Sequence, residues 1–211
     1  HDHEHEYEEE EFTANDIEDR PLSDFAGSWM SLQPMMEAGE LDAFCEHKAD
    51  EDDTATTEDY RARYAAGWMC DATNITVTDT TITFEFADGT TCEAEYAPAG
   101  YSIKFDEHGD ISSVRYQFET DSDTAPRYVQ FNDHGHEPAA AEHFHVYFGN
   151  EGFEEMMNSA TNPYFAPASF DVEEVLEMLM GHNHEHHHDE EEEHRDLAKR
   201  LLDAFKQQIA F

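Results

Sequence analysis

Histidine side chains gather in one short stretch, residues 133–149, whose sequence is DHGHEPAAAEHFHVYFG. His143 and His145 stand two residues apart in a segment that alternates like a β-strand. Both imidazoles therefore project from one face, about 6–7 Å apart at their roots. His134 ends the preceding strand, and the connection between the strands returns the chain toward the same point. Three converging imidazole nitrogens are typical of a zinc site whose fourth position takes water, a carboxylate or another histidine.

The alternative reading of an H-x-H pair is two solvated side chains on an ordinary strand. We expect these histidines to face the interior of a β-barrel, where a metal ion satisfies three imidazoles at once. Imidazole sites also accept copper and nickel, so the residues alone leave the native metal open.

Two further tracts rich in histidine and acid lie near the ends of the chain. We expect residues 1–11 to be a disordered arm and residues 182–194 to be a linker, because neither holds apolar side chains for a core. Their scattered histidines predict weaker metal sites that gather zinc. The alternatives are an expression tag and plain solvation.

The charge of the chain is strongly negative. Acidic residues outnumber basic ones 51 to 11, which gives a formal net charge of -40. Nucleic acid and anionic membranes would be repelled, so cations are the expected partners. Self-repulsion of this size predicts a monomer at low salt, although an amphipathic helix at the end of the chain favours some contact. It also predicts a saline source, because salt screens the repulsion.

The chain contains no apolar run long enough to span a membrane. It begins at His1 rather than Met, and we take this as the end left when an export leader is removed, although a trimmed chain begins in the same way. Cys45, Cys70 and Cys92 are too few for a disulfide framework. Cys70 and Cys92 are the favoured pair, because both flank the same expected hairpin region.

Helical and strand patterns divide the rest of the chain into one domain, residues 12–181. Residues 19–38 carry Phe25, Trp29, Leu32 and Met36 at near-helical spacing and predict one or two short helices. Further helical turns are expected at residues 41–48, 57–67, 151–158 and 171–180, with Gly67 as a left-handed terminus of its helix. A terminal amphipathic helix, residues 195–211, is expected beyond the linker.

Between these helices the pattern has period two. Residues 71–118, 127–132 and 143–148 predict about seven strands, separated by turns that include Ala99-Gly100. Sequential hairpins of this kind favour a mainly β fold with flanking helices, in which the strands close an antiparallel up-and-down barrel.

Several separated motifs resemble one known family. The segments DRPLSDFAGSW, EHKAD, RYVQFNDHG, EHFHVYFGN and NPYFAPASFDVEEVLEMLMGH, in this order over residues 12–182, are similar to the ZinT (YodA) family. The resemblance implies a lipocalin-like, calycin-type barrel in the bacterial periplasm. It also implies binding of zinc or cadmium, and transfer of zinc to the solute-binding component of a zinc ABC importer.

The family's three metal-binding histidines fall on His134, His143 and His145. The resemblance places a fourth, carboxylate ligand at Glu173 or Glu174. A family disulfide would use Cys92, but Thr120 stands where its partner is expected.

Three functions compete on these observations. The first is a non-catalytic metal-binding protein that buffers zinc and passes it on. The second is a lipocalin-type carrier of a small apolar ligand, with Tyr96, Tyr101, Phe105, Tyr116 and Phe118 lining a pocket. The third is a zinc hydrolase, against which stands the absence of an H-E-x-x-H arrangement.

Overall fold

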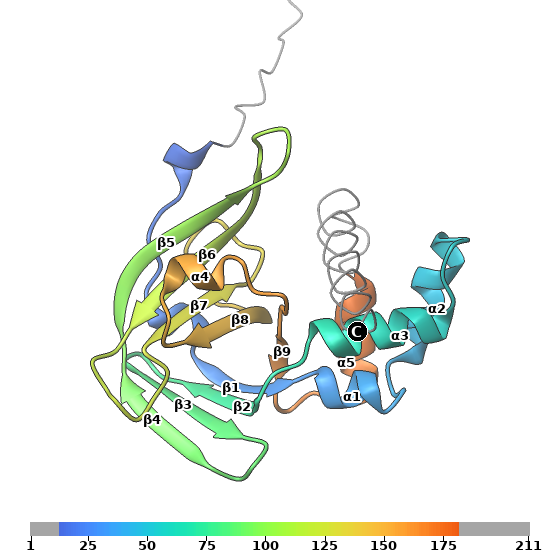
Figure 1. The fold of residues 1–211 in the computed structure, drawn as a ribbon, viewed down its shortest axis with the longest axis horizontal. Coiled ribbons are helices and arrows are strands. Elements are labelled where there is room, and N and C mark those ends of the chain that lie inside the picture. The colour runs from blue at the N-terminus through green and yellow to red at the C-terminus, as the bar shows by residue number, and fades with distance from the viewer. Residues whose placement is uncertain (1–12, 182–211) are drawn as a thin grey trace, which may run out of the picture.

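A computed structural model describes residues 13–181, which form one curved sheet with helices beside it (Figure 1). The sheet has nine strands in the order β4-β3-β2-β1-β9-β8-β7-β6-β5, and all neighbouring strands are antiparallel. The strands are β1 Gly27–Ser31, β2 Ala72–Val77, β3 Thr81–Phe86, β4 Thr91–Glu95, β5 Ala97–Phe105, β6 Ile111–Glu119, β7 Tyr128–Asn132, β8 Phe144–Gly149 and β9 Tyr164–Pro167. This arrangement confirms the predicted lipocalin-like fold class and the number of strands expected between residues 71 and 148. The sheet does not close as predicted, because its edge strands β4 and β5 do not pair with each other.

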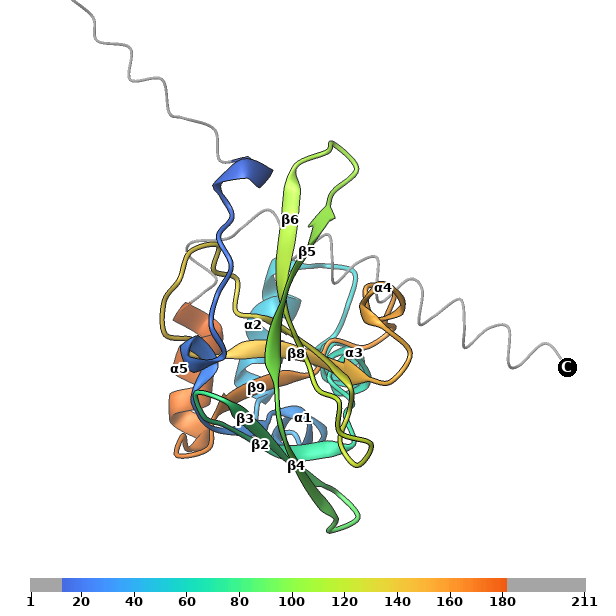
Figure 2. The same ribbon diagram turned by 90° about the vertical axis from the view of Figure 1, so that its left-hand side faces the viewer.

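The two edge strands of the sheet are consecutive in the chain. Only Tyr96 separates β4, which pairs with β3, from β5, which pairs with β6. The Tyr96 side chain is buried, and its hydroxyl donates a hydrogen bond of 2.5 Å to the carbonyl of Pro126. One long segment therefore serves both edges of the curved sheet, and β5 and β6 continue beyond it as a long hairpin (Figure 2).

Four helices gather on one side of the sheet next to β9 (Figure 1). They are α1 Gln33–Glu37, α2 Asp42–Glu51, α3 Thr57–Gly67 and α5 Val172–Gly181, and a short α4, Phe153–Met156, lies apart from them. Thr56 and Asp59 form a reciprocal capping box at the start of α3, and Asp171 and Glu174 do the same before α5.

The apolar side chains form two clusters, one on each face of the central strands. The barrel cluster fills the concave side of the sheet and includes Phe25, Phe131 and Phe144. The helical cluster includes Leu32, Trp68 and Tyr164, and it holds α1, α2, α3 and α5 against β9. Because β9 contributes to both clusters, the strands beside it lie at the junction between the barrel and the helices.

The structure corrects the prediction for residues 19–38. Only Gln33–Glu37 is an α-helix there, preceded by a 3-10 turn at Leu22–Phe25 and by strand β1. Trp29 pairs with Ile75 of β2 and with Pro167 of β9. The four apolar residues are buried as expected, but pairing with two distant strands overrides the local helical spacing.

Two glycine predictions are also wrong. Ala99-Gly100 is no turn between strands, because both residues lie inside β5, where the register shifts between Pro98 and Tyr101 and Gly100 has a φ of 80°. Gly67 is the last residue of α3, but it has no positive φ, and Trp68 caps the helix.

The predicted Cys70–Cys92 disulfide is absent, and all three cysteines are free thiols. Cys70 precedes β2, Cys92 lies in β4, and β3 runs between these strands. Two strand spacings amount to about 10 Å, which exceeds the Cα separation that a disulfide spans.

The predicted arm, linker and terminal helix, residues 1–11, 182–194 and 195–211, lie outside the described residues. Among the helices of residues 13–181, none combines the length and the apolar character that crossing a membrane requires.

Candidate metal centre

The β7–β8 hairpin brings the three predicted ligands together. Asn132, the last residue of β7, pairs with His145 in β8, so His134 follows the end of one strand while His143 stands directly before the other. The ring centroid of His134 lies 5.6 Å from that of His143 and 5.3 Å from that of His145. The hairpin register thus places His145 of β8, and His143 just before that strand, opposite His134 from the connecting loop.

The two strand histidines face away from the barrel core. Phe144 and Val146 point into the barrel cluster, so the alternation of β8 puts His143 and His145 on the opposite face, at the junction with the helices. The expectation that the histidines face the barrel interior is therefore wrong. Both are nevertheless buried, with 4% and 5% of their surfaces exposed.

Tyr164 of β9 orients both rings from the helical side. Its ring stacks on His143 with centroids 5.6 Å apart and an interplanar angle of 13°. The same ring meets His145 edge to face at 4.3 Å and 80°. Packing against one buried aromatic ring restricts the rotamers of both imidazoles.

The tautomer of His145 suits a metal ligand. Its Nδ1 lies 2.9 Å from the backbone carbonyl oxygen of Asn162. A carbonyl only accepts hydrogen bonds, so Nδ1 carries a proton, and in the neutral ring Nε2 then presents its lone pair. Histidine ligands to metals usually donate their other ring N–H to a carbonyl or carboxylate in this way.

The spacing of the rings also fits zinc. With Zn–N bonds of about 2.0–2.1 Å and tetrahedral angles, the centroids of two coordinated imidazoles lie about 5 Å apart. The centroid of the His134 ring lies 5.6 Å from that of His143 and 5.3 Å from that of His145, slightly wider than that value. Within residues 13–181 no group of three His, Cys, Asp or Glu side chains lies close enough to hold a metal ion as it stands, so ligation by the three histidines requires them to move inward.

The backbone holds His134 in an uncommon conformation. Its φ is 64°, the only positive φ at a residue other than glycine in the described part of the chain. The side-chain oxygen of Asn132 accepts a hydrogen bond of 2.9 Å from the His134 amide, and Asp133 accepts one of 3.0 Å from Gly135. These two hydrogen bonds hold the loop in a conformation that places the His134 ring near those of His143 and His145.

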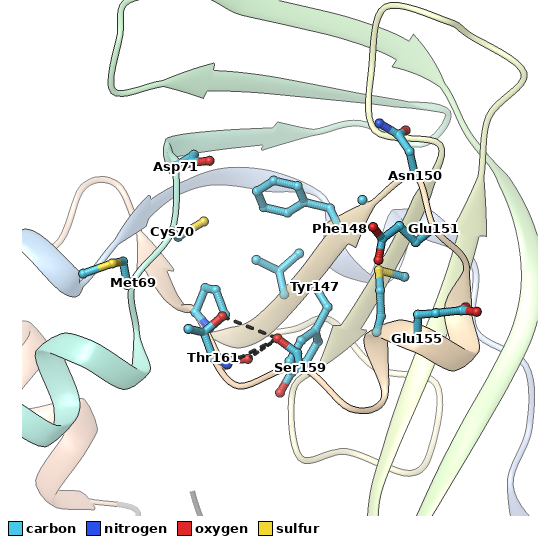
Figure 3. Close-up of a pocket in the computed structure, with 14 residues that line it drawn as sticks. Met69, Cys70, Asp71, Tyr147, Phe148, Asn150, Glu151, Glu155, Ser159 and Thr161 are labelled. Atoms are coloured by element: carbon cyan, nitrogen blue, oxygen red, sulfur yellow. Dashed lines mark hydrogen bonds between the residues drawn. The ribbon is translucent and has the colours of Figure 1, made fainter. Parts of the chain in front are cut away.

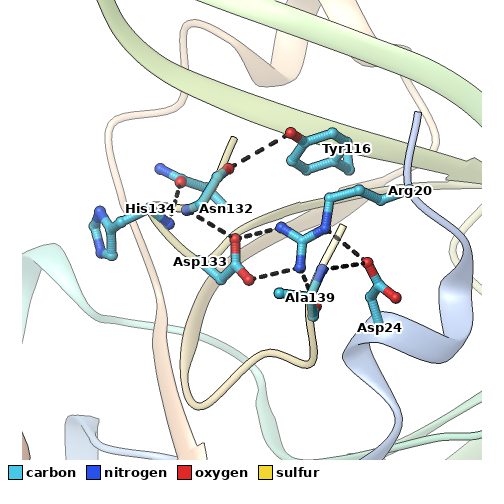
Figure 4. Close-up of polar contacts among 8 residues, drawn as sticks. Arg20, Asp24, Tyr116, Asn132, Asp133, His134 and Ala139 are labelled. Carbon is cyan, nitrogen blue, oxygen red and sulfur yellow. Dashed lines mark hydrogen bonds and ion pairs between the residues drawn. The ribbon is translucent and has the colours of Figure 1, made fainter. Parts of the chain in front are cut away.

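A buried arginine from the start of the domain fixes this loop (Figure 4). The Arg20 guanidinium binds both carboxylate oxygens of Asp133, at 2.6 and 2.8 Å, and donates 2.9 Å and 2.6 Å hydrogen bonds to Asp24 and the Ala139 carbonyl. Burial alone lowers the pKa of Arg20, but the bonds and charges of Asp133 and Asp24 outweigh this effect, so its pKa lies above the ordinary value. Arg20 is therefore charged at every relevant pH.

Sequence reasoning predicted the three histidines as ligands but missed this support. Arg20 is 113 residues from Asp133 in the chain, so no local pattern connects them. The one feature of the sequence that marks Arg20 is the scarcity of basic residues, since the chain has only 11 of them beside 51 acidic ones. The carboxylates predicted as a fourth ligand, Glu173 and Glu174, are exposed, and Glu174 accepts a hydrogen bond from the amide of Asp171 in the capping box.

A separate cavity of about 580 Å³ opens beside the far end of β8 (Figure 3). Tyr147, Phe148, Glu151 and Cys70 line it, and the three histidines do not. The aromatic residues expected to line an apolar ligand pocket lie elsewhere. Tyr96, Tyr116 and Phe118 are buried in the barrel cluster, Tyr101 packs against that cluster, and Phe105 is 51% exposed.

The fold and the site define a lipocalin-like protein that presents three histidines between a barrel and a helical layer. Comparison with known proteins places it in a family. The model of the ZinT (YodA) periplasmic lipocalin-like zinc-recruitment family matches residues 3–182, and the chain belongs to this family.

Relatives of known name agree with that assignment. The zinc-binding lipoprotein AdcA of Streptococcus pneumoniae is 35% identical over 169 residues, which are 79% of this chain but 33% of AdcA. The chain thus spans about a third of that relative's length. The probable metal-binding protein YrpE of Bacillus subtilis is 31% identical over 174 residues, 81% of this chain and 68% of YrpE.

A solved structure shows the same fold. The crystal structure of the Zn(II)-bound ZinT-like domain of Streptococcus pneumoniae AdcA superposes with a TM-score of 0.74 at 34% identity. The match covers 80% of this chain and 94% of that domain.

Proposed function

We propose that this chain binds one zinc ion through His134, His143 and His145 and serves zinc uptake. The observation that carries the proposal is the convergence of three imidazoles on one hairpin, two of them buried. The bond from His145 Nδ1 to the Asn162 carbonyl supports it, because that bond sets the tautomer that ligates metal. The zinc-bound state of the related AdcA domain supports the choice of metal.

We further propose that the protein works outside the cytoplasm and catalyses no reaction. It captures zinc, buffers it, and passes it to the solute-binding component of a zinc ABC importer. Cadmium would occupy the same site, since it shares a preference for nitrogen and sulfur ligands. An open fourth position favours exchange, because an incoming ligand can bind before a histidine leaves.

The domain boundaries and the accessory sites belong to the same proposal. Residues 12–181 are the metal-binding domain. Residues 1–11 and 182–194 supply weaker sites that raise the local zinc concentration. The acidic surface suits a protein that works at high salt, where counterions screen its self-repulsion, and at low salt the same repulsion keeps it a monomer.

Calorimetric titration with zinc at high salt tests the site. We expect one tight site in the intact chain and its loss when His134, His143 and His145 are all changed to Ala, with weaker sites retained. A matched control changes His47 and His108 to Ala, because both side chains are exposed and lie outside the hairpin. Tight binding that survives the triple change would refute the assignment.

Zinc transfer needs a second experiment. The zinc-loaded chain is mixed with a purified solute-binding protein of a zinc importer, and the rate of transfer is followed. A rate that rises with acceptor concentration indicates direct handover. A rate that equals spontaneous dissociation at every acceptor concentration would contradict it.

A further inference from the structure

Residues 133–142 connect β7 to His143, and the start of the domain holds this loop at three separate points. Arg20 binds Asp133, next to His134. Arg20 and Asp24 together bind the carbonyl and the amide of Ala139. The Asp24 carbonyl accepts a 2.7 Å hydrogen bond from the amide of Ala141, two residues before His143.

The guanidinium at the centre of this arrangement is itself rigidly placed. Its side chain has no exposed surface, and its central carbon lies 4.6 Å from the ring centroid of Phe25 and 4.9 Å from that of Tyr116. Four of its five N–H groups are used in the bonds to Asp133, Asp24 and Ala139. A planar, forked donor is needed here, because a lysine ammonium cannot form the two parallel bonds to Asp133.

We propose that Arg20 is a positioning residue for the metal centre, setting zinc affinity by fixing the loop that carries His134 against the strand that carries His145. This inference rests on the proposed zinc site. The positive φ of His134 shows why the loop must be held. If Arg20 no longer bound Asp133, the loop would relax toward commoner backbone conformations and turn the imidazole away. The metal would then have to restore the loop geometry on binding, which weakens its affinity.

The test compares zinc affinity, by competition with a chelator, in the full chain and in Arg20→Lys, which keeps the charge but loses the fork. We expect Arg20→Lys to bind zinc about 10- to 100-fold more weakly, the usual effect of losing a partner that supports a metal ligand. The matched control is Arg127→Lys, because Arg127 forms an exposed pair with Glu119 away from the site. Its affinity should stay within twofold of the unchanged chain.

A double-mutant cycle separates positioning from general damage. In a chain that already carries His134→Asn, Arg20→Lys should change the weaker, residual zinc affinity of His143 and His145 less than twofold, because there is no His134 ring left to position. Equal effects in both backgrounds would overturn the proposal. So would an unchanged affinity in Arg20→Lys when hydrogen exchange at the Ala139 and Ala141 amides shows that the loop has loosened.

If Arg20→Lys does not fold, Asp24→Asn takes its place, with an expected loss of about tenfold and the same cycle. Failure of the proposed zinc site itself looks different, because the unchanged chain would then lack a tight site that depends on the three histidines. Reciprocal coupling gives a further readout. Saturating zinc should slow exchange at the Ala139 and Ala141 amides, and more so in Arg20→Lys than in the unchanged chain. If zinc slowed exchange at these amides equally in both proteins, Arg20 would not be a positioning residue.

Discussion

The conformation of His134 yields a prediction that separates the backbone of the site from its ligands. His134 has a φ of 64°, where glycine and asparagine fit readily and a β-branched residue is strained. His134→Asn and His134→Val both remove the imidazole, so both should lose tight zinc binding. Only His134→Val should also lose stability in the absence of metal, because the loop cannot relax while the side chains of Asn132 and Asp133 hold the amides of residues 134 and 135.

The expected size follows from the cost of the left-handed region. That cost is about 1–2 kcal/mol for an ordinary L-residue, so His134→Val should unfold with a free energy lower than His134→Asn by about that amount. With a urea dependence of about 2 kcal/mol per molar, the midpoints should differ by about 0.5–1 M. The assay is equilibrium urea denaturation at high salt with chelator present. Midpoints that coincide would show that residue 134 does not hold a positive φ in solution.

Three further predictions concern stability. Free zinc at a hundred times its dissociation constant should raise the free energy of unfolding of the unchanged chain by about 2.7 kcal/mol. The variant with His134, His143 and His145 changed to Ala should not gain this stabilisation. An equal rise in both proteins would contradict the assignment of these histidines. Phe144→Ala should lower the free energy of unfolding by about 3–5 kcal/mol in urea denaturation, because Phe144 is fully buried among aromatic rings. Phe105→Ala, at a side chain 51% exposed, should change it by less than about 0.5 kcal/mol. Similar losses in both variants would show that the core is misplaced. Burial raises the pKa of the Cys45 thiol to about 11 from 9.0, so the folded state holds that proton more tightly than the unfolded chain. The stability that comes from this shift is fully present below pH 9 and is lost as the pH rises toward 11. The stability difference between the unchanged chain and Cys45→Ala should therefore shrink by up to about 3 kcal/mol over this range. A difference that stays constant with pH would refute the raised pKa.

The strands were predictable where their pairing is local. Residues 71–118 form hairpins between neighbours in the chain, so alternation and turn residues define them without knowledge of the rest. β1 and β9 were missed because each is short and they pair with each other across more than 130 residues. The apolar residues of β1 are spaced in a way that a helix would also bury, so periodicity alone cannot decide between the two.

The proximity of the three histidines was predictable for the same reason. His134, His143 and His145 lie on one hairpin, so their spacing in the sequence translates directly into proximity. The direction they face was wrongly predicted, because alternation separates the two faces of a strand without saying which face meets the barrel core. Phe144 and Val146 are the stronger apolar pair on β8, and they occupy that core.

The residues that support the site come from segments far from the hairpin in the sequence, whereas the histidines all lie on it, and this difference has a physical consequence. Asn162 and Tyr164 come from the segment after α4, and Arg20 and Asp24 come from the start of the domain. A hairpin that carries three histidines binds metal only as well as its loop is held, because imidazoles that must be gathered on binding lose affinity to the ordering of the chain. The hairpin itself supplies few of the restraints, since the loop from 133 to 142 contains no regular structure. Most of them come from segments far away in the sequence, which contact the site only in the folded domain. Formation of a tight site should therefore depend on the folded domain, and an isolated peptide of residues 128–149 should bind zinc far more weakly despite holding every ligand.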